Sequence, residues 1–79
     1  MATKAPDAAG WVIEVVTLAP ESPPTFKYFN VAIADVTEAV QAIRMRRDVV
    51  QANRVEAVKA LSAKEIAALR LRAGQVKPA

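Results

Sequence analysis

Few side chains in this sequence are suited to nucleophilic or acid–base catalysis. The chain contains two serines, Ser22 and Ser62, and it contains neither histidine nor cysteine. A serine hydroxyl becomes a nucleophile only beside a general base, and histidine is the commonest such base. Ser62 also begins a capping-box sequence that ends at Glu65, which gives it a structural role as a helix cap. We therefore expect no catalytic residues and no enzymatic activity.

Residues that hold metals, cofactors or phosphate groups are equally sparse. The eight Asp and Glu residues are scattered singly, without the spacing of a calcium loop. Zinc sites usually use cysteine and histidine, which the sequence lacks. Gly10 and Gly74 are the two glycines of the chain, so no glycine-rich loop can cradle a phosphate. We expect no metal site and no cofactor.

Basic residues are concentrated in the second half of the chain. Residues 1–39 contain two Lys against five Asp or Glu, a net charge of −3, whereas residues 40–79 contain nine Lys or Arg against three, a net of +6. A basic segment of this kind can bind an anionic partner, or it can simply keep the protein soluble. The candidate anion-binding residues are Arg44, Arg46, Arg47 and Arg54.

Two strands are predicted in the first half of the chain. Residues 11–18 are mostly aromatic or β-branched and end before a proline, which favours a strand. Residues 26–34 form the second predicted strand, with aromatic and β-branched residues on alternating faces. Residues 19–25 contain three of the five prolines, so we predict a loop there.

Two helices and a third strand are predicted in the second half. Asp35 can cap a helix whose apolar stripe includes Val40 and Ile43. Residues 48–53 are a predicted connection. Residues 54–61 fit either a strand or a helix; we favour a strand because Ser62 begins the next helix, which runs to about Leu69.

The element order therefore predicts an α+β fold of the type ββαβα. We expect a three-stranded, mostly antiparallel sheet of strand order 2-1-3 with both helices on one face. The alternative is a ββ hairpin followed by a helical hairpin. The predicted organisation is a flexible tail over residues 1–9, one small domain over residues 10–74 and a frayed C-terminus over residues 75–79. The predicted core consists of Ile13, Val15, Phe29, Val31, Val40, Ile43, Ile66 and Leu69.

One face of this predicted sheet has no helix to cover it. It is apolar apart from one acidic residue, and we expect it to be an interface. Its candidate residues are Val12, Glu14, Val16, Leu18, Phe26 and Tyr28. Glu14 is expected either to pair with Lys27 of a second copy or to lie at the rim in water.

These patterns favour a non-catalytic protein-interaction module that self-associates as a homodimer. The alternative function is nucleic-acid binding by the basic second half of the chain. The sequence contains no apolar run near the roughly 18 residues of a membrane helix. With no cysteine and no targeting signal, we expect a cytoplasmic protein without membrane partners.

Overall fold

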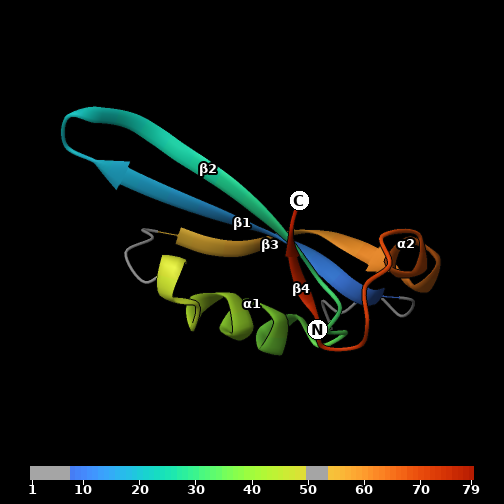
Figure 1. Ribbon diagram of the computed structural model, residues 1–79. Coiled ribbons are helices and arrows are strands. Elements are labelled where there is room, and N and C mark those ends of the chain that lie inside the picture. Colours follow the sequence, from blue (N-terminus) through green and yellow to red (C-terminus); the bar gives the residue numbers. More distant parts are fainter. Residues whose placement is uncertain (1–7, 50–53) are drawn as a thin grey trace.

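The computed structural model describes residues 8–49 and 54–79, which form an antiparallel sheet with two α-helices (Figure 1). A long hairpin comes first, followed by a helix, a third strand, a short helix and a fourth strand. The elements are β1 (Ala8–Ala19), β2 (Ser22–Val31), α1 (Val36–Arg44), the 3₁₀ turn η1 (Arg47–Val49), β3 (Arg54–Ser62), α2 (Ala63–Ala68) and β4 (Val76–Pro78). The α+β prediction is confirmed at this level.

The sheet has four strands in the order β3-β1-β2-β4, and every neighbouring pair is antiparallel. The prediction of three strands in the order 2-1-3 is therefore wrong. β1 does lie between β2 and β3, but β4 adds a further strand beside β2. The segment predicted to fray, residues 75–79, contains β4, in which Val76 pairs with Val31 and Lys77 pairs with Asn30.

The proline-rich segment is part of the hairpin and not a loop. The chain turns at residues 20 and 21, and Ala19 pairs directly with Ser22. Pro23 and Pro24 lie in β2 beside a register irregularity. A proline is tolerated on a strand that has a partner on one side only, because its missing N–H is then not needed. β4 pairs with β2 only from Phe29 onward, so the proline-containing part of β2 has that freedom.

α1 covers one face of the sheet and forms the main core with it. Asp35 is the N-cap of α1, and its side chain accepts a hydrogen bond of 3.0 Å from the Glu38 backbone N–H, as predicted. Trp11 Nε1 donates a 2.9 Å hydrogen bond to the Ala34 carbonyl and so ties β1 to the segment before α1. The buried residues of this core are Trp11, Ile13, Val15, Phe29, Val31, Ala39, Ile43, Val49 and Val55, with Val40 partly buried against them.

α2 packs on the opposite face of the sheet, at the end where β1 begins. Trp11 faces α1, and successive residues of a strand face opposite sides, so a side chain at Gly10 would lie on the face away from α1. A Cβ at Gly10 would lie 2.8 Å from Cδ1 of Ile66 in α2, which shows how closely the helix approaches the strand. The prediction of both helices on one face is thus wrong. Ile66 and Leu69 lie outside the α1 core, Ile66 half-buried and Leu69 exposed.

The ends of the third strand and of the second helix follow local sequence signals. β3 ends at Ser62, which confirms the strand over the helical alternative for residues 54–61. The Ser62 hydroxyl accepts from the Glu65 N–H at 3.1 Å, and Glu65 Oε1 accepts from the Ser62 N–H at 2.9 Å, completing the predicted capping box. At the other end, Arg70 adopts a positive φ of 58°. Ala8 and Ala9, predicted within a tail, begin β1; residues 1–7 and the predicted connection over residues 50–53 lie outside the described residues.

Candidate functional site

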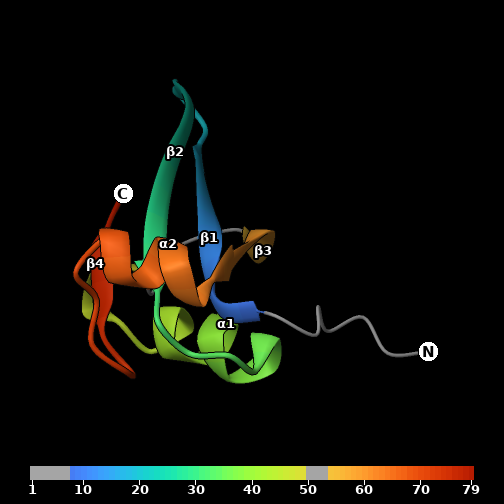
Figure 2. The same cartoon turned by 90° about the vertical axis from the view of Figure 1, so that its right-hand side faces the viewer.

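The sheet face opposite α1 is the candidate site, and we call it the open face. Three cross-strand rows carry its central side chains, because paired residues of neighbouring strands point to the same side. Val12 lies between Lys59 and Asn30, Glu14 between Glu56 and Tyr28, and Val16 between Arg54 and Phe26. The register thus brings together five of the six interface residues predicted from the sequence; the sixth, Leu18, lies at the register irregularity and lines a hollow with Val16 and Phe26. Figure 2 shows the strands from the end at which α2 flanks them.

The charged groups at the centre of the open face are paired with one another. Tyr28 Oη donates a 2.8 Å hydrogen bond to Glu14 Oε2. Arg54 Nη2 lies 3.7 Å from Glu14 Oε1, and Arg54 Nε lies 3.2 Å from Glu56 Oε1. Glu14 and Glu56 stand directly opposite each other, and like charges in that position repel. The guanidinium of Arg54 therefore offsets a repulsion that the strand register imposes.

This network corrects the expectation for Glu14. Its side chain is only 15% exposed and already has two partners within its own chain. Lys27, the expected partner from a second copy, pairs with Val15 and therefore belongs to the face on the α1 side. The hydrogen bond to Glu14 is the largest cause that raises the pKa of the Tyr28 phenol above its ordinary value; desolvation and the negative charge of Glu14 act in the same direction.

The hairpin extends beyond the rest of the sheet as an arm, which we define as residues 17–25 (Figure 1). Among residues 8–49 and 54–79, the last pair between β1 and β3 is Val16 with Arg54, and no described strand lies beside the arm. Leu18 is 55% exposed and Phe26, next to the arm, is 53% exposed. A hollow of about 370 Å³ lies here, lined by Val16, Leu18, Pro24, Phe26 and Arg54. Val16, a predicted interface residue, is itself buried, so it offers little surface to a partner.

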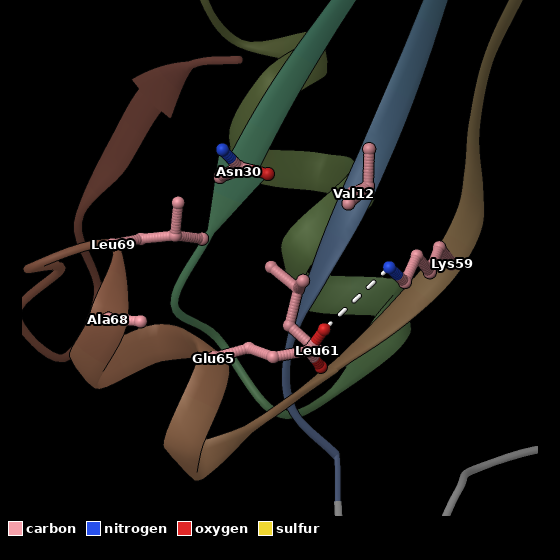
Figure 3. A pocket seen from close by; sticks show the side chains of 7 residues that line it. All are labelled: Val12, Asn30, Lys59, Leu61, Glu65, Ala68 and Leu69. Atoms are coloured by element: carbon pink, nitrogen blue, oxygen red, sulfur yellow. Dashed lines mark ion pairs between the residues drawn. The ribbon is translucent and has the colours of Figure 1, made fainter.

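Another hollow, of about 320 Å³, lies at the opposite end of the open face beside α2 (Figure 3). We call it the α2 hollow; its lining residues are Val12, Asn30, Lys59, Leu61, Glu65, Ala68 and Leu69. Of these, only Val12 was predicted as an interface residue. Asn30 shares its face of β2 with Phe26 and Tyr28, so alternation along the strand is a sequence signal that identifies it. Glu65, Ala68 and Leu69 line the hollow only because α2 packs over Gly10, and no local sequence pattern indicates that packing.

Two of the three polar side chains of the α2 hollow, Glu65 and Lys59, form an ion pair, and the capping box orients Glu65. Glu65 Oε2 lies 3.6 Å from Lys59 Nζ, while its other oxygen accepts from the Ser62 N–H. That backbone hydrogen bond is the largest cause that lowers the pKa of the Glu65 carboxyl, and the Lys59 ammonium also lowers it against a desolvation effect that raises it. Leu61 of β3 and Leu69 at the end of α2 form the apolar wall of the hollow.

The four arginines predicted to bind an anion do not form one cluster. Arg54 belongs to the open face, where it pairs with two glutamates. Arg44 Nη2 donates a 3.4 Å hydrogen bond to the Val55 carbonyl, and the Arg46 guanidinium lies 4.8 Å from the ring centroid of Phe29 on the α1 side. Arg47 is exposed in η1.

Within residues 8–49 and 54–79, no group of three acidic side chains is placed to hold a metal ion. The described helices are also too short to cross a membrane. Comparisons with protein-family models, with curated proteins and with solved structures found no match to this chain. The geometry of the open face therefore provides the basis for the functional proposal.

Proposed function

We propose that this protein is a small, non-catalytic interaction module that associates with a second copy of itself through the open face. The observation that carries the proposal is the exposure of Leu18, Phe26 and Tyr28 on one sheet face that α1 does not cover. Apolar side chains gathered in this way are typical of protein interfaces. A two-fold axis would place the same patch of each copy against the other.

The charges of the open face are compatible with burial in such an interface. A buried charge is costly unless it is paired and hydrogen-bonded. Glu14 already accepts from Tyr28 and is close to Arg54, and Arg54 also pairs with Glu56. Removing this network from water therefore costs less than removing isolated charges. The absence of histidine and cysteine from the sequence supports a role without catalysis, and the lack of cysteine also supports a cytoplasmic location.

Sedimentation equilibrium over a range of micromolar concentrations tests the proposal. The wild-type chain should approach twice its 8.5 kDa mass as its concentration rises. Leu18→Asp should shift the equilibrium to the monomer, because a charge without a partner would enter the interface. Leu18 is exposed, so this variant should keep the circular dichroism spectrum of the wild type.

Met45→Asp is the matched control. Met45 is 79% exposed and follows α1, on the side away from the open face. Its replacement introduces the same charge and should leave the dimer intact. A wild-type protein that stays at 8.5 kDa at every concentration, or a Leu18→Asp variant that dimerises normally, contradicts the proposal.

A specific observation on the α1 side favours nucleic-acid binding as a second candidate function. Lys27 lies two residues from Phe29 on the same face of β2, and the Arg46 guanidinium lies over the Phe29 ring. Arg44 is anchored nearby on Val55, which pairs with Val15 opposite Lys27. Basic groups contributed by distant parts of the chain thus lie on the α1 side of the sheet.

Titration with single-stranded oligonucleotides at several salt concentrations tests this second candidate. Phosphate contacts make the affinity fall with salt, and the slope reflects the number of contacts. Lys27→Glu should weaken binding and reduce the slope, whereas Lys77→Glu, on the opposite face, should change binding much less. No binding at low salt, or equal losses from both variants, would remove this candidate.

A further inference from the structure

We propose that, in the dimer formed through the open face, the hairpin arm of each copy occupies the α2 hollow of the other. This inference rests on the proposed self-association and specifies its symmetry. The two-fold axis would cross β1 perpendicular to the strands, at the level of Val15, midway between Leu18 and Val12. Each copy would then contribute one apolar projection and one hollow, and both would be filled at once.

The positions of the arm and the α2 hollow on one face carry this inference. Leu18 belongs to the arm and Val12 to the α2 hollow, and both residues lie on β1 with side chains on the open face. Six residues separate them, which is roughly 20 Å along a strand. A two-fold rotation about the midpoint exchanges these positions between copies. Leu18 of one copy is then brought to the apolar wall that Leu61 and Leu69 form in the other.

The same axis makes the remaining rows complementary. It places the row of Val16 against the row of Glu14 in the partner. Arg54 therefore faces the partner's Glu56, and Phe26 faces the partner's Tyr28. Opposite charges meet, and two aromatic rings come together, an arrangement that is favourable beyond the apolar area it buries. An axis parallel to the strands would instead put the two arms side by side and leave both α2 hollows empty.

Charge at the ends of the molecule supports the same arrangement. Glu21 is exposed at the turn of the hairpin. At the opposite end of the open face, Lys59 pairs with Glu65 at the α2 hollow, and Lys64, exposed in α2, leaves the net charge of these three residues positive. The transverse axis brings the acidic turn of each copy toward this basic end of the other. The chemistry of the α2 hollow therefore fits a hairpin with apolar side chains and an acidic turn. The arm of a second copy is such a hairpin.

Cysteine cross-linking tests the axis directly, because the wild-type chain has no cysteine. Full-length Leu18→Cys and Leu69→Cys variants are prepared separately, mixed under reducing conditions to exchange subunits, and then oxidised. The mixture should yield a disulfide-linked dimer on a denaturing gel, whereas either variant alone should yield little. A mixture of Leu18→Cys with Met45→Cys controls for random collision and should not cross-link.

The outcomes separate this inference from the proposed function. If Leu18→Cys cross-links efficiently with itself, the axis runs along the strands and the inference is wrong, while the dimer stands. If sedimentation shows a dimer of both variants but their mixture does not cross-link, the arm lies outside the α2 hollow. If the wild-type chain remains monomeric at all concentrations, the proposed function fails and the inference fails with it.

Discussion

Replacing Gly10 by alanine tests the packing of α2 against β1. At an ordinary position within a strand, Gly to Ala stabilises a protein by roughly 0.5–1 kcal/mol, because the chain loses less entropy on folding. At Gly10 the added Cβ would collide with the Val31 carbonyl oxygen and would lie 2.8 Å from Ile66 Cδ1 and 3.2 Å from Ala32 Cα. The structure therefore predicts destabilisation.

The magnitude follows from the atoms that the methyl group meets. Overfilling a well-packed site typically costs about 1–3 kcal/mol. The end of the Ile66 side chain can rotate away, but the Val31 carbonyl is backbone within the hairpin and can move only with its strand. We therefore expect a net loss near 2 kcal/mol in the free energy of unfolding. For a chain of this size, that corresponds to a fall in Tm of roughly 8–16 °C.

Urea unfolding followed by circular dichroism measures this loss. Protein concentration is held fixed, because association would make stability depend on it. Gly74→Ala is the control, since Gly74 has a φ of 80° and a Cβ there meets nothing within 4 Å. Its cost, about 1–2 kcal/mol, comes from the backbone alone. Ile66→Ala should reduce the cost of Gly10→Ala without abolishing it, and should leave the cost of Gly74→Ala unchanged.

A stabilised Gly10→Ala variant would refute the reasoning. It would mean that the site has room for a methyl group and that α2 does not press on β1 there. Equal costs in the presence and absence of the Ile66 side chain would show that the Val31 carbonyl alone is responsible. That result would support the pairing of β1 with β2 in the hairpin, but it would not support the position of α2 over Gly10.

Four further measurements follow from the structure. Phe29→Ala should cost about 3–5 kcal/mol in urea unfolding, because Phe29 is 3% exposed in the main core. Ser62→Ala should cost roughly 0.5–2 kcal/mol by removing the hydroxyl that caps α2. Absorbance titration should find the pKa of Tyr28, the single tyrosine, above its ordinary value, and this pKa should fall in the Glu14→Gln variant. The hydrogen bond between Tyr28 and Glu14 stabilises the fold below the ordinary pKa of tyrosine, and this stabilisation is lost as pH rises through the raised pKa. The Glu65 carboxyl should titrate below its ordinary pKa by NMR, so its contribution to stability is present above that ordinary value and is lost as pH falls through the lowered pKa.

Three of these results bear on separate parts of the fold. An unchanged stability of Phe29→Ala would mean that the strand faces are inverted. A neutral or stabilising Ser62→Ala would contradict the cap and would favour a helix running through residue 62. A Tyr28 pKa that does not respond to Glu14→Gln would place the two side chains apart.

The sequence alone determined the elements whose signals are local. Asp35 and Ser62 begin helices because a short polar side chain can reach the free N–H groups of the first turn, and this needs no distant partner. Alternation along β1 and β2 identified the two faces of the hairpin correctly, because successive side chains of a strand must point to opposite sides. Most of the open face was therefore predictable by residue.

Only the tertiary structure decided how the remaining parts meet. The prolines of β2 and the short strand β4 contradict their local signals, because strand pairing at an edge depends on residues far away in the chain. α2 lies on the open face because Gly10 leaves room for Ile66, a contact between residues 56 positions apart that no periodicity reveals. Arg54 was grouped with the other arginines by charge, yet the register of β3 places it beside Glu14 and Glu56. Neighbouring residues determine local helix and strand propensity. The open face depends instead on the strand register, which decides which side chains from distant parts of the sequence lie next to one another.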